Sequence, residues 1–130
     1  MQNRFIITSG IFGALTVALG AMGAHALKML ITPDSLQTFE TAVKYQMYHT
    51  LALLLTGILM QNNSSGLLKW AGRLFIMGII LFSGSLYFLA TRSLIGLDEM
   101  RWVGAITPFG GLAFISGWLL LAFSFYNKKA

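Results

Sequence analysis

Residues 5–27 read FIITSGIFGALTVALGAMGAHAL and contain no Lys, Arg, Asp or Glu. A bilayer core of about 30 Å is crossed by about 20 helical residues, each rising about 1.5 Å. An unpaired peptide group in hydrocarbon costs several kcal/mol, so such a run must be helical or part of a closed barrel. Because barrel strands alternate polar with apolar residues and this run does not, we predict a membrane-spanning helix.

Three further runs are also long and apolar enough to be membrane-spanning helices. They are residues 45–68 (apolar as far as residue 60), 74–91 and 102–127. The segments between the four runs carry nearly every charge. We therefore predict one all-α domain over residues 1–130, an integral membrane bundle of four transmembrane helices. Its expected helices cover about 5–27, 33–61, 70–91 and 104–127.

The composition favours lipid surroundings over water. The chain is 56% hydrophobic and 10% charged, whereas a soluble domain is about one quarter charged. The net charge of +5 comes from Lys and Arg residues that are scattered singly or in pairs. Basic residues that flank membrane spans explain this pattern better than a nucleic-acid surface does. We expect the lipid bilayer, and not nucleic acid, as the partner.

Local signals mark where two helices begin. Thr32-Pro33-Asp34 predicts a helix start. Thr32 would be the N-cap, Pro33 the proline of the first turn, and Asp34 the acid at the positive end of the helix. Thr107-Pro108 either caps the last helix in the same way or kinks a longer one. Ala24-His25-Ala26 imitates a signal-peptide cleavage site, but the preceding apolar run is longer than a usual signal core, so we expect a retained span.

The distribution of basic residues predicts the orientation. With four spans, both termini lie on the same side of the membrane. Five basic residues fall on that side against four on the other, which places the termini in the cytoplasm by the positive-inside rule. The first group is Arg4, Lys69, Arg73, Lys128 and Lys129, and the second is Lys28, Lys44, Arg92 and Arg101.

Small residues indicate where helices approach closely, because lipid tails are as apolar as leucine and burial alone does not join helices. The first run offers a row at four-residue spacing, Gly10, Ala14 and Ala18, together with Gly13. The last run offers Gly110, Gly111, Ala113 and Gly117. We expect these residues to form tight seams within the bundle, or equally a homo-oligomer or an interface with another membrane protein.

His49 is the one ionisable residue that the sequence places well inside a span, and such residues are functional candidates. We predict a polar pocket in the half of the bundle away from the termini. Its expected members are His25, Tyr45, Gln46, His49, Ser83, Ser85, Tyr87 and Thr107.

Four interpretations of this pocket compete. The favoured one is a structural hydrogen-bond network with a neutral His49. The second is a solute or proton pathway, since histidine titrates near neutrality. The third is haem ligation by His25 and His49, which their different depths disfavour. The fourth is that the helices serve a partner protein or lipid, with the outer loops as the contact surface.

Catalytic signatures are missing from the sequence. It has no cysteine, which rules out thiolate metal sites, and no phosphate-binding glycine loop, His-Glu-x-x-His or Gly-x-Ser-x-Gly motif. We therefore assign no catalytic residue, cofactor or metal site and expect that the protein is not an enzyme.

Four motifs resemble one family in order and spacing. They are residues 20–27 (GAMGAHAL), 41–52 (TAVKYQMYHTLA), 82–87 (FSGSLY) and 106–111 (ITPFGG), the last followed by Gly117-Trp118. This arrangement resembles the YgdD/YwdK group of small four-helix bacterial membrane proteins, a domain of unknown function. The resemblance implies a four-span protein of the bacterial inner membrane and no established activity. We expect a structural or accessory membrane component, with a solute or proton transporter around His49 as the alternative.

Overall fold

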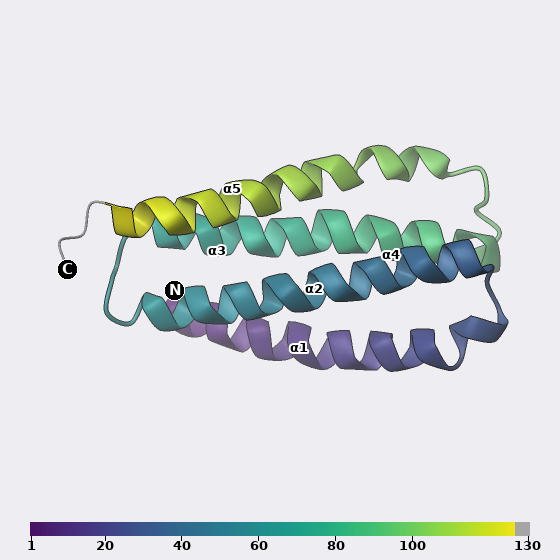
Figure 1. Cartoon of the computed structure of the whole chain (residues 1–130), viewed down its shortest axis with the longest axis horizontal. Helices are drawn as coiled ribbons and strands as arrows, with labels where there is room; N and C mark the ends of the chain where they lie inside the picture. The colour runs from purple at the N-terminus through teal and green to yellow at the C-terminus, as the bar shows by residue number, and fades with distance from the viewer. Residues whose placement is uncertain (127–130) are drawn as a thin grey trace.

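The computed structural model describes residues 1–126, and all of their regular structure is helical. Four rods lie side by side with alternating directions (Figure 1). They are α1 (Gln2–Ala24), α2 (Pro33–Leu59), a composite third rod and α5 (Thr107–Tyr126). The third rod consists of α3 (Gly66–Gly78), a π-helical turn η2 (Ile79–Ser83) and α4 (Gly84–Thr91). The predicted all-α class is confirmed; Lys128 and Lys129, used in the charge count, lie outside the described residues.

The two ends of the bundle differ in their connections (Figure 1). At the turn end, α1 begins, residues 60–65 join α2 to α3, and α5 ends. At the loop end, residues 25–32 and 92–106 form longer links that contain the short helices η1 (Leu27–Met29), η3 (Arg92–Ile95) and η4 (Arg101–Ala105). Gly96 ends η3 with a φ of 71°, a left-handed conformation that favours glycine.

Helix starts follow from their capping residues. The Thr32 side chain accepts a hydrogen bond from the Ser35 backbone N–H at 3.2 Å, as the sequence predicted for an N-cap. The Ser65 side chain caps α3 through the Leu67 backbone N–H at 3.2 Å, so the third rod begins at Gly66 rather than near residue 70. At α5, Thr107 is the first helical residue and not the cap, and its hydroxyl is bonded to Ser85 on α4.

Three helical stretches are long and apolar enough to cross a membrane, among the residues that the structure describes. They are Gln2–Met29, Gly66–Ile95 and Arg101–Tyr126. Helix α2 is not among them, although the sequence predicts a fourth span there. Its polar residues explain the difference. The exposed charges of Asp34, Glu40 and Lys44 lower its mean hydropathy, and so do Gln46 and His49, which are buried within the bundle.

Glycines in α3 and α5 make room for aromatic rings of the facing helix. A Cβ atom on Gly78 would lie 2.2 Å from the ring of Phe114, and one on Gly117 would lie 2.8 Å from the ring of Phe75. Each helix therefore inserts a ring into the other's glycine gap. Backbones also meet directly, because a Cβ on Gly110 would lie 2.3 Å from the Phe82 backbone nitrogen. This seam uses the small residues of the last run, including buried Ala113, as close helix packing requires.

The seam between α1 and α2 uses a different face of α1 from the expected row. Gly10, Ala14 and Ala18 are exposed, and a Cβ on Gly10 would meet nothing within 4 Å. The contact instead involves Gly23, whose added Cβ would lie 2.9 Å from the Phe39 ring, and Gly13, which lies near Thr50. Small residues occupy both faces of α1, so spacing alone did not identify the packed face.

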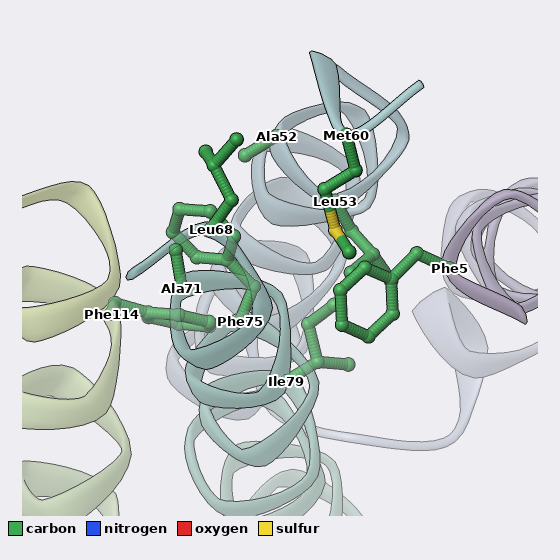
Figure 2. Close-up of a cluster of buried hydrophobic side chains, with 9 residues drawn as sticks. All are labelled: Phe5, Ala52, Leu53, Met60, Leu68, Ala71, Phe75, Ile79 and Phe114. Atoms are coloured by element: carbon green, nitrogen blue, oxygen red, sulfur yellow. The ribbon is translucent and has the colours of Figure 1, made fainter. Parts of the chain in front are cut away.

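One apolar cluster joins all four rods near the turn end and the middle of the bundle. Figure 2 shows Phe5 of α1 and Phe114 of α5 entering it from opposite sides. The Phe5 ring rests on Gly72, where a Cβ would lie 2.2 Å from it. The other members are Ala52, Leu53, Met60, Leu68, Ala71, Phe75 and Ile79.

Substitution of Gly110 tests the backbone contact between α5 and η2. We expect Gly110→Ala to destabilise the protein by about 1–3 kcal/mol, because backbone atoms rather than a flexible side chain must move. The matched control is Gly10→Ala, at an open helical position where alanine is favoured over glycine by about 1 kcal/mol. Thermal unfolding in detergent, followed by circular dichroism, measures both. Equal effects of the two substitutions would contradict the close contact.

Candidate functional site

His49 lies buried on α2, and both of its ring nitrogens have partners. The indole N–H of Trp118 donates to Nε2 at 3.1 Å, and Nδ1 lies 2.7 Å from the Tyr45 carbonyl oxygen. An indole nitrogen only donates, so Nε2 must be the acceptor. The proton of a neutral imidazole is then on Nδ1, which donates to the carbonyl. This assignment follows from the hydrogen bonds and gives a neutral ring with no unused nitrogen.

Aromatic rings enclose the imidazole. Phe114 of α5 stacks on it with ring centroids 3.5 Å apart and an angle of 10° between the planes. Phe75 and Trp118 contact it at centroid distances of 5.9 Å and 6.0 Å. The Phe114 ring reaches His49 only because Gly78 leaves space for it. The position of His49 therefore depends on the seam between α3 and α5.

Gln46 connects three helices through one side chain. Its Nε2 donates to the Phe12 carbonyl oxygen of α1 at 3.2 Å, and its Oε1 accepts from the Tyr87 hydroxyl of α4 at 2.6 Å. Gln46 is only 4% exposed, so both ends of the amide are satisfied away from solvent. Such a bridge fixes the relative positions of α1, α2 and α4.

Serine and threonine hydroxyls join the third rod to its neighbours. Ser83 donates to the Ala42 carbonyl oxygen of α2 at 2.8 Å, and Ser85 is bonded to Thr107 of α5 at 2.5 Å. Ser85 also donates to the Phe82 carbonyl oxygen within its own rod. Thr50 is different, since its buried hydroxyl has no hydrogen-bond partner within the described residues.

The structure brings some of the eight predicted pocket residues together and places others apart. Gln46 bonds to α1 and to Tyr87 of α4, His49 bonds to Trp118 of α5, and Ser83 and Ser85 bond to different neighbours. His25 is exposed just beyond the end of α1, far along the chain and apart from this network. With both nitrogens of His49 engaged, the structure does not bring the two histidines together as a ligand pair.

A groove of about 570 Å³ lies between α2 and α5, beside His49. Its lining is mostly apolar and aromatic. The residues that face it include Tyr45, Tyr48 and His49 from α2, Phe82 from η2, and Phe114 and Trp118 from α5. The mainly aromatic lining makes this a hydrophobic site, in contrast to the polar pocket that the sequence suggested.

Sequence reasoning missed the partner of His49. The indole N–H of Trp118 on α5 donates to His49 on α2. The hydrogen bond from Gln46 to the Phe12 carbonyl oxygen was also missed, because the amino-acid sequence does not indicate which backbone carbonyl accepts a bond. One feature of the sequence hints at the bond between Trp118 and His49. Trp118 lies deep in the last apolar run, away from the membrane interfaces where tryptophan is usually enriched.

A double-mutant cycle measures the bond between His49 and Trp118. We expect His49→Phe and Trp118→Phe to couple by about 0.6–1.7 kcal/mol, the range of hydrogen bonds between membrane helices. Unfolding free energies of the two single variants and the double variant, measured in mixed detergent, give the coupling. Tyr126→Phe with His49→Phe is the control pair, since Tyr126 is exposed at the turn end. Additive effects of His49→Phe and Trp118→Phe would contradict the bond.

Comparisons with known proteins identify relatives over nearly the whole chain. A family described as "Protein of unknown function (DUF423)" matches residues 19–111. A UPF0382 membrane protein of Staphylococcus haemolyticus is 43% identical over 97% of this chain and 98% of its own length. No solved structure matches.

Two relatives carry the names that the sequence motifs suggested. The UPF0382 membrane protein YwdK of Bacillus subtilis is 43% identical over 90% of this chain and 91% of its own length. The UPF0382 inner membrane protein YgdD of Escherichia coli strain K12 is 38% identical over 93% of this chain and 88% of its own length. The resemblance is confirmed, and the chain belongs to the DUF423 family and is similar to the UPF0382 membrane proteins.

Proposed function

We propose that the chain is a four-span protein of the bacterial inner membrane that acts as a structural or accessory component, and not as an enzyme or a transporter. The observation that carries this proposal is the state of His49. Its two ring nitrogens are bonded to Trp118 and to the Tyr45 carbonyl oxygen, and Phe114 stacks on its face. The group best suited to chemistry inside the bundle is occupied in holding helices together.

Helix α2 is the fourth span in this proposal. It connects the loop end, where α1 finishes, to the turn end, where α3 begins (Figure 1). If α1 and the third rod cross the bilayer, α2 must return through the same thickness. Its 27 residues reach about 40 Å at 1.5 Å each. The side chains that it exposes in its second half, Leu51, Leu55 and Ile58, are apolar and suited to lipid.

The charges support an orientation with the turn end in the cytoplasm. Within the described residues, Arg4, Lys69 and Arg73 lie at the turn end, which carries no acidic residue there. The loop half contains basic residues together with all four acids of the chain. Over the whole sequence, five Lys and Arg residues fall on the side of the termini and four on the other side, and the positive-inside rule places the richer side in the cytoplasm.

The transport alternative requires a solute or a proton to reach a polar group that is free to bind it. Gln46, Tyr87, Ser83, Ser85 and Thr107 are instead bonded to each other or to backbone carbonyls. A buried polar network that is satisfied in this way rigidifies a bundle. The exposed row of Gly10, Ala14 and Ala18 leaves α1 open to close approach by a helix of another protein or a second copy.

Measurements on sealed vesicles test the structural role. We expect vesicles that contain the protein to show the same proton permeability as protein-free vesicles. His49→Ala should lower the thermal stability, because it removes the Trp118 bond and the Phe114 stack, and should leave permeability unchanged. The control is Leu55→Ala, which truncates an exposed side chain on the same helix. A proton flux or solute uptake that His49→Ala abolishes in a folded protein would instead establish transport.

A further inference from the structure

Two charged side chains on α2 are exposed on the outer surface of the bundle. Glu40 and Lys44 lie one helical turn apart and therefore on the same face. Figure 1 shows α2 between α1 and the third rod, and α2 packs on them through other faces, where Val43 meets α1 and Ala42 meets the third rod. Neither charge forms an ion pair with any residue that the structure describes. The single chain therefore leaves an acid and a base uncovered side by side.

The third rod marks the middle of the membrane. Its uncharged run, residues 74–91, is bounded by Arg73 and Arg92. At about 1.5 Å per residue this run is nearly as long as a hydrocarbon core of about 30 Å, so its midpoint lies close to the bilayer centre. Ser83 is at this midpoint, and its hydroxyl donates to the Ala42 carbonyl oxygen of α2 at 2.8 Å. Ala42 is therefore level with the bilayer centre.

Glu40 and Lys44 are therefore attached to α2 near the middle of the bilayer and not at its surface. Each is two residues from Ala42, which is about 3 Å along the helix axis. Helix α1 gives a similar level, because a Cβ on Gly20 would lie 3.4 Å from Val43, and Gly20 is about 6 Å from the middle of the uncharged run of α1. With Lys44 at this depth, the loop end keeps three of its four basic residues, so the excess of basic residues at the turn end is larger.

Lipid is a poor environment for these two side chains. A charged group at the centre of a bilayer is costly, and such groups almost always face protein or a water-filled cavity. A lysine near the end of a span can extend its amine to the membrane surface. Lys44 cannot do so, because the surface is about 15 Å from the bilayer centre, farther than a lysine side chain reaches. This face of α2 is therefore suited to contact with protein.

The pattern of charges matches a second copy of the same chain. Two copies inserted in the same direction are related by a twofold axis along the membrane normal, so equivalent residues lie at equal depth. Glu40 of one copy is then about 6 Å from the level of Lys44 in the other. Helical side chains point toward the helix N-terminus, so each lysine extends toward the level of the opposite glutamate. A different protein would have to present the reverse pair at the same depth.

Small residues beside the two charges leave room for a close approach. A groove of about 160 Å³ between α1 and α2 borders Glu40 and Lys44. Its α1 wall consists of Gly20, Gly23 and Ala24, so no side chain on that wall is larger than a methyl group. Helices approach closely in membranes where such residues face the partner. Helix α2 of a second copy can therefore lie along this groove with its own charged face turned inward.

We propose that two copies of the chain pair through this face of α2, with Glu40 of each copy bonded to Lys44 of the other. The contact is isologous, since the same patch serves both copies. Its four charges alternate in sign and sum to zero, so the dimer covers groups that the single chain exposes to lipid. This inference rests on the proposed membrane-spanning arrangement and adds a second copy as the partner.

Charge reversal on separate chains tests whether the pair acts between copies. A chain with Glu40→Lys presents two positive charges on this face, and a chain with Lys44→Glu presents two negative charges. Neither is expected to pair with itself, because like charges meet, whereas the two should pair with each other when they are co-expressed with different affinity tags. Recovery of the second tag with the first should be at least about tenfold higher for the mixed pair than for either variant with itself. Equal recovery in all three cases would contradict the contact between copies.

Cysteine crosslinking in native membranes tests the same interface without a change of charge. The natural chain has no cysteine, and Tyr48 is exposed one turn after Lys44 on the same face. Tyr48→Cys should give a covalent dimer with a short bifunctional maleimide. The matched control is Ala14→Cys, exposed on the side of α1 away from α2 at a similar depth, since the adjacent Gly13 lies near Thr50. It should stay monomeric under the same treatment.

Three results would overturn the inference and leave the membrane-spanning arrangement intact. The first is a dimer from Ala14→Cys in place of Tyr48→Cys, which would move the interface to the far side of α1. The second is a crosslink from Tyr48→Cys to a different protein. The third is modification of Lys44→Cys by a water-soluble maleimide in a monomeric protein, which would show a water-filled path at this face. Protein that stays dispersed without detergent would instead refute the spanning arrangement itself.

Discussion

The structure depends on how Gln46 and His49 of α2 are hydrogen-bonded inside a bundle whose core is mainly apolar. In hydrocarbon there is no water to accept or donate a hydrogen bond, so each polar group needs a partner within the protein. Gln46 meets this need by bonding to the Phe12 carbonyl oxygen and to Tyr87, and His49 meets it through Trp118 and the Tyr45 carbonyl oxygen. Two buried polar residues of α2 are therefore the ones that join it to α1, α4 and α5.

Glycine makes these polar contacts possible. Gly78 leaves the space that the Phe114 ring occupies, and Phe114 in turn stacks on the His49 ring. On the other side of the bundle, the Phe39 ring lies over Gly23, and Tyr87 contacts Phe39 at a centroid distance of 5.0 Å. Close approach of backbones, aromatic packing and buried hydrogen bonds form one connected arrangement. The same rings leave a groove between α2 and α5 that this part of the chain does not fill.

The sequence predicts the rods well and the contacts between them poorly. Long apolar runs and the Thr32 cap have local causes, so the helices and the start of α2 could be predicted. Contacts between helices depend on which face of each rod turns inward. In α1 both faces carry small residues, and the row of Gly10, Ala14 and Ala18 proved to be exposed. For the same reason, the bond from Trp118 to His49, 69 residues apart, had no local signature.

The central claim is that α2 crosses the membrane with its polar face turned inward, although its mean hydropathy does not mark it as a span. Because the natural chain has no cysteine, single cysteines at exposed Lys28 and Ser64, on either side of α2, report its topology directly. Labelling of intact spheroplasts with a membrane-impermeant maleimide should modify Lys28→Cys, and should modify Ser64→Cys only after lysis. Modification of both positions from the same side would contradict the account, because α2 could then not be a membrane-crossing helix.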